Sequence, residues 1–166
     1  MNEYAFNTQL KIGEKYESVL DKYFSRFFVI SEAPIELQKL GVDRIFTNRQ
    51  NGKVTSVEYK TDFKTDKTGN VFLETVSMDI NEKPGWAFTS IAQVLMYYVP
   101  GLNTVFIADM LEIKSNIDRY ISECGTLSVN NGWYKAAGVA LPLDHFRECV
   151  ISEVEVIDEQ NTERII

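Results

Sequence analysis

The sequence contains few of the residues that build zinc sites and disulfide frameworks. There is one histidine, His145, and there are two cysteines, Cys124 and Cys149, in 166 residues. Structural zinc sites are assembled mainly from His and Cys pairs, so such a site is nearly excluded. Two cysteines are too few for a disulfide framework, which favours a reducing cytoplasm. Any metal held by this chain is therefore expected to have oxygen ligands, as Mg²⁺, Mn²⁺ and Ca²⁺ do.

Long hydrophobic runs and a secretion signal are missing as well. The longest apolar run, "VLMYYV", is far too short to cross a bilayer, and the polar, acidic N-terminus has no signal-peptide pattern. We therefore expect a cytoplasmic protein without membrane association. No repeat, linker or low-complexity tract interrupts the sequence, whose length suits one packed core. This predicts a single domain over residues 1–166, with an acidic C-terminal segment at about residues 151–166.

Positive charge is scarce and unevenly placed. The formal net charge is −7, which argues against a general nucleic-acid binder. Residues 39–67 nevertheless carry seven Lys or Arg against four Asp or Glu. This weakly basic segment is expected to line the binding side of any contact with nucleic acid.

The hydrophobic pattern predicts alternating helices and strands. A helix is expected from Gly13 to about Phe28. Strands are expected over residues 42–48, 53–63 and 70–77, followed by a helix over 89–99, a strand over 103–110, a helix over 111–123, a strand over 134–143 and a short helix over 143–150. This order predicts an α/β domain with a mixed central β-sheet flanked by helices.

The dipeptide Asn51-Gly52 is a strong signal for a hairpin with a two-residue turn. In that register Asp43 lies opposite Lys60, and Glu58 shares their face because strand side chains alternate. Asp43 and Glu58 would then be diagonal neighbours, roughly 7–8 Å apart at the backbone. A slip of one residue would instead place Asp43 on the opposite face.

Two carboxylates and an amine on one strand face suit metal-assisted hydrolysis of phosphodiesters. Asp43 and Glu58 would hold Mg²⁺, which polarises the phosphate and lowers the pKa of a bound water. Lys60 would orient or deprotonate that water and stabilise the developing negative charge. The alternative is a solvated strand face, although strands are generally poor in Asp, Glu and Lys.

These residues resemble a known family. The sequence "GVD", followed fifteen residues later by "EYK", is similar to the PD-(D/E)xK nuclease superfamily of restriction endonucleases, junction resolvases and phage or repair exonucleases. The preceding "GEKYE" matches its Gly-x-x-x-Glu helix pattern at Gly13 and Glu17. The stretch "QVLMY" resembles the Gln-x-x-x-Tyr element of exonuclease-type members, and "PGW" the Gly-Trp of small phage-type members. The resemblance covers residues 13–146 and implies a restriction endonuclease-like core.

The resemblance implies a role for each matching strand residue. Asp43 and Glu58 would bind Mg²⁺ or Mn²⁺, and the backbone carbonyl of Tyr59 would complete the protein ligands. Lys60 would activate the attacking water. Val42 stands where the superfamily motif has proline, which is a common relaxation of the pattern.

Further roles are implied outside the hairpin. Glu17 would support the metal through a water, with Glu14 as the alternative carboxylate of the first helix. Gln93 would contact the site or the phosphate, although many phage-type members have Ala-Asp where this chain has Ala92-Gln93. Tyr97 is expected in the core, and Glu74 is a further candidate on the third strand.

The implied function is a Mg²⁺-dependent deoxyribonuclease that hydrolyses DNA phosphodiester bonds in one step. Two alternatives remain open. The chain could be a nuclease-fold module that binds nucleic acid or protein without cleaving, which the acidic composition favours. It could also be an unrelated α/β interaction protein with a chance motif. Many small members of the superfamily act as homodimers, so a homodimer is one expected assembly. The sequence leaves endonuclease and exonuclease action equally open.

Overall fold

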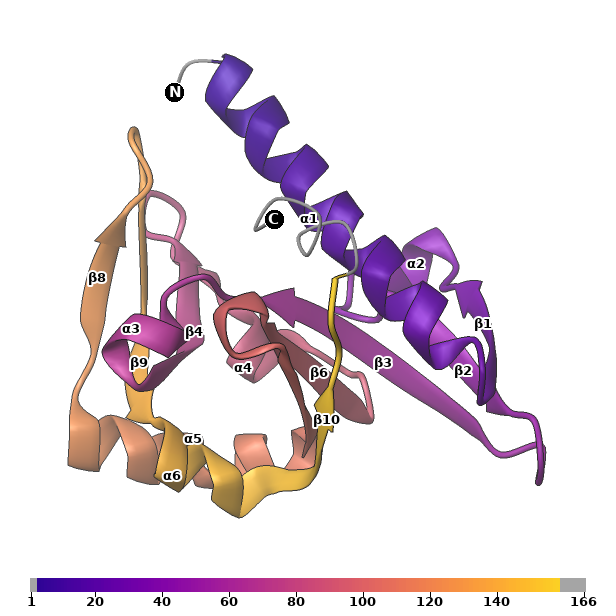
Figure 1. Cartoon of the computed structure of the whole chain (residues 1–166). Helices are drawn as coiled ribbons and strands as arrows, with labels where there is room; N and C mark the ends of the chain where they lie inside the picture. Colours follow the sequence, from indigo (N-terminus) through magenta and orange to yellow (C-terminus); the bar gives the residue numbers. More distant parts are fainter. Residues whose placement is uncertain (1–2, 159–166) are drawn as a thin grey trace, which may run out of the picture.

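The computed structural model describes residues 3–158, with side chains from residue 11 onward, and contains two β-sheets (Figure 1). The central sheet has the strand order β1-β2-β3-β6-β7-β10, and the second sheet has the order β5-β4-β9-β8. The central strands are β1 (Phe28–Glu32), β2 (Arg44–Asn48), β3 (Val54–Thr61), β6 (Val94–Val99), β7 (Thr104–Asp109) and β10 (Val150–Glu155). The second sheet consists of β4 (Asn70–Met78), β5 (Lys83–Pro84), β8 (Leu127–Asn130) and β9 (Lys135–Pro142).

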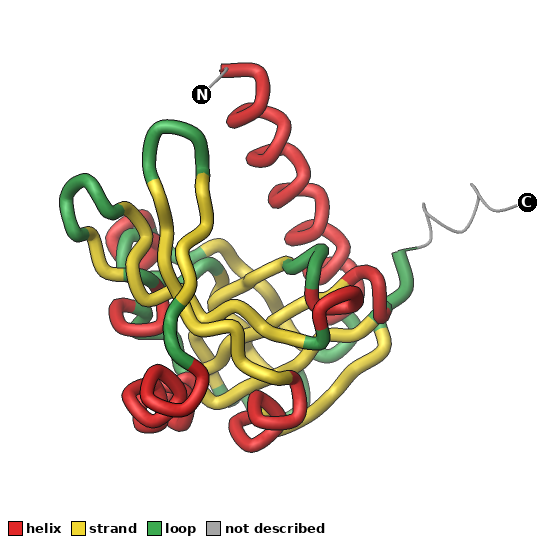
Figure 2. The backbone as a smooth tube through the Cα atoms, turned by 90° about the vertical axis from the view of Figure 1, so that its left-hand side faces the viewer, coloured by secondary structure: helices red, strands yellow, loops and turns green. Residues whose placement is uncertain are grey.

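Two long helices accompany the sheets, α1 (Glu3–Phe24) and α5 (Met110–Cys124). The shorter elements are α2 (Ile35–Gln38), α3 (Thr65–Thr68), α4 (Trp86–Thr89), α6 (Leu143–Phe146) and the 3₁₀ turns η1 (Pro100–Leu102) and η2 (Arg147–Cys149). The turns that end β4 and join β8 to β9 project toward the same side as the N-terminal end of α1 (Figure 1, Figure 2). None of the described helices combines the length and the hydropathy that spanning a membrane requires.

The central sheet is mixed. Strand β3 runs parallel to β6, whereas the other neighbours in this sheet are antiparallel. A parallel connection needs a crossover, and here the crossover contains α3, β4, β5 and α4. The prediction of a mixed central sheet flanked by helices is therefore confirmed.

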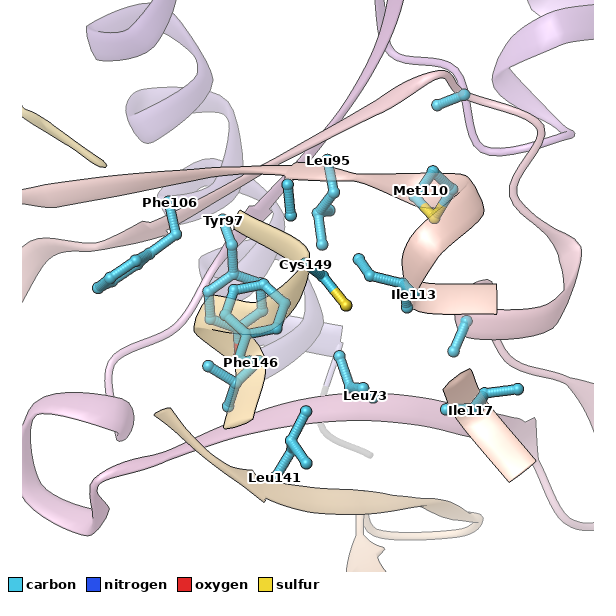
Figure 3. Packing of buried hydrophobic residues seen from close by; sticks show 14 of the residues in the cluster. Leu73, Leu95, Tyr97, Phe106, Met110, Ile113, Ile117, Leu141, Phe146 and Cys149 are labelled. Atoms are coloured by element: carbon cyan, nitrogen blue, oxygen red, sulfur yellow. The ribbon is translucent and has the colours of Figure 1, made fainter. Parts of the chain in front are cut away.

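The two faces of the central sheet bury two separate apolar clusters. The first cluster lies against α1 and includes Leu20, Phe24, Phe46, Tyr59 and Tyr98. The second lies between the central sheet, α5 and the second sheet and includes Leu73, Leu95, Tyr97, Ile113, Leu141 and Phe146. Figure 3 shows the side chains of Leu73 and Leu141 pointing toward Leu95 and Tyr97 across this interior. The central sheet thus carries a buried layer on each side.

The helix predicted over residues 89–99 is wrong. Trp86–Thr89 forms one helical turn, and Val94–Val99 is the central strand β6. This strand is enclosed between β3 and β7, and its last five residues are buried. A short, unbroken apolar run fits a strand buried on both faces as well as it fits a helix, because neither leaves a polar face to reveal the period.

Other boundaries differ from the expectation. The first helix ends at Phe24, because Phe28 already begins β1 and pairs with Asn48 of β2. The third predicted strand exists as β4 but belongs to the second sheet. Part of the acidic C-terminal segment forms β10 beside β7, and residues 159–166 of that segment lie outside the described residues. The helix α5 and the strands β7 and β9 are confirmed.

Candidate functional site

The β2–β3 hairpin turns through four residues, Arg49–Gly52, instead of the predicted two. The side-chain oxygen of Asn48 accepts hydrogen bonds from the backbone N–H groups of Gln50 at 2.8 Å and Asn51 at 3.2 Å. Asparagine commonly starts a turn in this way, because its side chain replaces a backbone acceptor. Asn48 therefore opens the turn earlier than the Asn51-Gly52 signal suggests.

The longer loop shifts the strand register by two residues. Arg44 pairs with Val57, so the same register extended by one residue places Asp43 opposite Glu58 and not opposite Lys60. The predicted pairing is wrong, but a shift of two residues leaves every side chain on its original face. Asp43, Glu58 and Lys60 therefore still share one face of the hairpin.

Glu58 is the most deeply buried acidic residue of this face, with 2% of its surface exposed. Its Oε1 atom lies 2.7 Å from the Nζ atom of Lys60, whose side chain is 35% exposed. Its Oε2 atom is buried and has no hydrogen-bond partner among the described residues. Burying a carboxylate oxygen without a partner is costly, so this atom marks a position where a bound cation or donor would be stabilising.

Ser90 lies beside the Glu58 carboxylate but directs its hydroxyl elsewhere. The residue is fully buried, and its Oγ atom donates to the carbonyl oxygen of Gly41 at 3.0 Å. A hydroxyl has a single proton, so while it binds Gly41 it cannot satisfy Glu58. Gly41 has a φ of 82°, and a Cβ atom at this position would lie 2.8 Å from Ser90 Oγ. This contact therefore depends on glycine.

Asp43 is held at the edge where β2 begins. Its carboxylate accepts a hydrogen bond from the backbone N–H of Tyr59 at 2.7 Å, and its own N–H donates to the carbonyl of Val57 at 2.9 Å. Alternate peptide groups of a strand point to the same edge, so the Tyr59 carbonyl faces the Asp43 side as the Val57 carbonyl does. The predicted backbone ligand thus points toward the predicted side-chain ligand.

Glu17 is placed on the α1 side of the sheet, in an ion-pair network with Arg44. Arg44 Nη2 lies 2.9 Å from Glu17 Oε2, and Arg44 Nε lies 3.1 Å from Asp21 Oδ2. Asp21 also accepts the hydroxyl of Tyr59 at 2.9 Å. The superfamily pattern does not include Asp21, although its position one turn after Glu17 is a signal present in the sequence. Glu14 is exposed, so Glu17 is the carboxylate that α1 brings to the sheet.

The pKa values show that Asp43 links the two groups of charges. Burial raises the pKa of Glu58, Lys60 lowers it, and the negative charge of Asp43 raises it further. Burial likewise raises the pKa of Glu17, Arg44 lowers it, and Asp43 again raises it. Asp43 is therefore close enough to interact with carboxylates on both faces of the sheet.

Lys60 is surrounded by negative charge. Burial disfavours its ammonium form, but Glu58, Asp43 and Glu74 together raise its pKa above the ordinary lysine value. Burial also raises the pKa of the Glu74 carboxyl, and Lys60 lowers it. The Nζ atom of Lys60 additionally lies 6.0 Å from the ring centre of Trp86. The second sheet thus contributes Glu74 to the site.

Gln93 is not brought to Lys60. It precedes β6, and its side-chain carbonyl accepts the backbone N–H of Ser56 at 3.0 Å, near the start of β3. Tyr97 is buried as expected, and its hydroxyl donates to Asp62 and accepts the N–H of Phe72. The Gln-x-x-x-Tyr element therefore leads into the strand β6 and does not lie on a helix.

The basic segment does not form one surface. Arg44 is 12% exposed and is committed to its ion pairs on the α1 side. Arg49 lies in the loop before β3, whereas Lys60 lies near the end of that strand. Lys64 and Lys67 are exposed and follow the end of β3, the strand that carries Lys60. The segment therefore does not present all of its positive charges on one face, and its role in lining a binding side stays a prediction.

Within the described part of the chain, no group of three or more His, Cys, Asp or Glu side chains is arranged to hold a metal ion. The candidate set is smaller, with the carboxylates of Asp43 and Glu58 beside the Tyr59 carbonyl. Mg²⁺ is commonly bound through one or two carboxylates while it keeps several waters. The unpartnered Oε2 atom of Glu58 and the all-oxygen donor set fit such an ion.

Comparison of the chain with protein-family models, with curated proteins and with solved structures gave no match. Function is therefore inferred from the geometry around Glu58.

Proposed function

We propose that this chain is a deoxyribonuclease, dependent on Mg²⁺ or Mn²⁺, which hydrolyses DNA phosphodiester bonds beside Asp43, Glu58 and Lys60. The observation that carries the proposal is the Glu58 carboxylate. It is 2% exposed, one oxygen pairs with Lys60, and the other has no partner among the described residues. A carboxylate that served only the fold would be expected to have both oxygens satisfied. A buried carboxylate oxygen without a partner in the described part of the chain therefore favours a ligand-binding role.

Each residue has a distinct task in this proposal. Asp43 and Glu58 would hold the divalent ion from neighbouring strands, and the Tyr59 carbonyl would assist. The ion, when bound, supplies Lewis acidity and lowers the pKa of water. Lys60 is cationic at neutral pH because its pKa is raised, so its first role is to orient water and to stabilise negative charge on the phosphate.

The arrangement of elements also supports the restriction endonuclease-like core that the sequence resemblance implies. The helix α1, which carries Glu17, precedes the β2–β3 hairpin, and the strand that carries Glu58 and Lys60 lies in the middle of a mixed sheet beside β6. Glu17 would act from the α1 side through Asp43, the residue whose charge reaches both groups.

A nuclease-fold module that binds DNA without cleaving it is the second candidate. The 2.7 Å ion pair between Lys60 and Glu58 favours it, because that pair occupies one oxygen of the proposed metal ligand. The net charge of −7 favours it as well, since phosphate contacts generally need positive charge. Binding of a divalent ion with no cleavage of any substrate would support this candidate.

A panel of DNA substrates separates the two. Single strands, duplexes, flaps and junctions would be incubated with the protein in Mg²⁺, in Mn²⁺ and in EDTA. We expect cleavage of at least one substrate with either metal, none in EDTA, and none by Glu58→Gln. Glu14→Gln is the matched control, because it neutralises an exposed glutamate of α1 and should cut like the parent. Cleavage in EDTA, or normal cleavage by Glu58→Gln, would refute the proposal.

A further inference from the structure

A cavity of about 510 Å³ opens beside Lys60. One wall is the end of β3 with the following segment up to Lys64, and the other is the face of the second sheet formed by β4, β8 and β9. Lys60 belongs to both the cavity wall and the ion pair with Glu58. The cavity is therefore continuous with the candidate site.

Small residues on β9 create this space. Phe72 of β4 pairs with Ala140, and Glu74 pairs with Gly138, so large side chains on one strand face small ones on the next. A Cβ atom on Gly138 would lie 2.6 Å from an atom of the Phe72 ring and 2.4 Å from the carbonyl oxygen of Leu73. The Phe72 ring therefore lies against Gly138, whereas Ala136 and Ala140 are the β9 residues that line the cavity.

The cavity brings together three kinds of side chain. They are the aromatic rings of Phe63, Phe72, Trp86 and Tyr97, the polar groups of Asn70, Asn131 and Glu74, and the cations of Lys60 and Lys64. Aromatic rings stack on nucleobases, and amides and carboxylates hydrogen-bond to base edges. The two lysines that line the cavity can contact phosphates. This combination matches the parts of a nucleotide.

We propose that the cavity receives an unpaired base of a single-stranded DNA segment whose phosphate lies beside Lys60. This inference rests on the proposed function, since it uses the same lysine to position the phosphate. The volume of about 510 Å³ lies in the range of small-molecule sites. A paired base could enter only after it had left the duplex stack, which costs energy that a single strand does not pay. Single strands, overhangs and loops are therefore the preferred substrates over continuous duplex.

Tryptophan fluorescence can report occupancy of the cavity directly. The chain has two tryptophans, and Trp133 is 57% exposed in the turn between β8 and β9 and is not one of the residues that line the cavity. Trp133→Phe leaves Trp86 as the only tryptophan. Titration of this variant in EDTA with a short single-stranded oligonucleotide should quench Trp86 saturably. The same sequence as a blunt duplex should bind at least about tenfold more weakly.

Two variants test the location. Ala140→Met should fill the cavity, and Trp86→Ala should remove one stacking ring. Each should raise the Kd for a fluorescently labelled single strand by about tenfold or more, the effect of losing one base–aromatic stack. Trp133→Ala is the matched control and should leave this Kd unchanged. Melting temperatures identify a variant that fails to fold. Ala140→Met and Trp86→Ala change different elements, so one folded variant is enough to test the location of the base.

The outcomes separate this inference from the proposed nuclease activity. Metal-dependent cleavage without any response of Trp86 to single strands would refute the cavity and leave the nuclease proposal standing. Quenching of Trp86 by single strands without cleavage of any substrate would support the cavity and refute the nuclease proposal. Equal affinity for single strand and duplex, or an unchanged Kd in a folded Ala140→Met variant, would also overturn the inference.

Discussion

The Nζ atom of Lys60 lies 2.7 Å from the Oε1 atom of Glu58, two residues earlier on the same strand. Side chains two residues apart on a strand share a face, so this contact follows from local geometry once both residues face inward. The pair stabilises half of a buried carboxylate and leaves Glu58 Oε2 without a partner among the described residues. One buried oxygen of Glu58 therefore has a positively charged partner, whereas the other is buried without compensation from the described residues.

The first prediction concerns the pH dependence of stability in EDTA. Burial raises the pKa of Glu58 in the folded protein, so folding favours its protonated form. The protonated Glu58 carboxyl therefore stabilises the folded protein. This stabilisation is fully present below the pKa of Glu58 in the unfolded chain, near 4.5, and is lost as pH rises through its pKa in the folded protein. Glu58→Gln removes this dependence. The melting temperature of the variant minus that of the parent should be larger at pH 7.5 than at pH 4.5, and a constant difference would contradict the burial effect.

The second prediction concerns Lys60→Ala. Lysine is not a metal ligand, so the variant should bind Mg²⁺ yet cut DNA about 100- to 1,000-fold more slowly, the range for losing one group that stabilises developing negative charge. The metal-free variant should melt at a lower temperature, because Glu58 loses its partner. The loss should be smaller than the roughly 3–5 kcal/mol of a fully buried pair, since Lys60 is 35% exposed.

Calorimetric titration with Mg²⁺ and melting with and without the ion check this second prediction. Mg²⁺ should raise the melting temperature of Lys60→Ala by more than that of the parent, because it would replace the missing positive charge. A variant that still cuts at the parental rate, or that loses its affinity for Mg²⁺, would show that Lys60 has another role.

The third prediction places the DNA on the side of Lys64 and Lys67. The double variant Lys64→Glu/Lys67→Glu should weaken binding to single strands and lower the slope of log Kd against log salt by about 1.4, if each lysine contacts one phosphate. Arg49→Glu/Lys53→Glu is the control, because it changes the net charge equally at the opposite end of the hairpin. Equal losses in both variants would indicate a general charge effect and no defined binding side.

The grouping of Asp43, Glu58 and Lys60 was predictable from the sequence because it depends on strand alternation alone. The face was correct although the register was shifted by two residues, since an even shift preserves alternation. The turn itself was not predictable from Asn51-Gly52, because Asn48 competes for the same backbone donors. Two turn-forming asparagines three residues apart allow more than one loop length.

The position of β6 and the environment of Glu58 could not be predicted. The run "VLMYYV" has no polar residue to distinguish a period of two from one of 3.6, and only its pairing with β3 and β7 decides. Ser90 and Glu74 reach the site from the crossover between β3 and β6, through contacts with no local sequence signal. Long-range packing thus determined the part of the site that the pattern missed.

The most direct measurement of the central claim is DNA cleavage by Asp43→Asn in Mg²⁺. The substitution removes one negative charge. In the parent, the Asp43 carboxylate accepts a hydrogen bond from the backbone N–H of Tyr59 at 2.7 Å, and the amide oxygen of asparagine can accept the same bond. Losing the Lewis acidity of the metal should cost several kcal/mol of transition-state stabilisation, and each 1.36 kcal/mol is a factor of ten in rate.

Cleavage by Asp43→Asn should therefore fall by about a thousandfold or more, with weaker binding of Mg²⁺. The metal-free variant should melt at the parental temperature or slightly above it, because repulsion with Glu58 is relieved. If Asp43→Asn instead cuts DNA in Mg²⁺ at the parental rate, the three residues form only a charged strand face, and the proposed nuclease site is wrong.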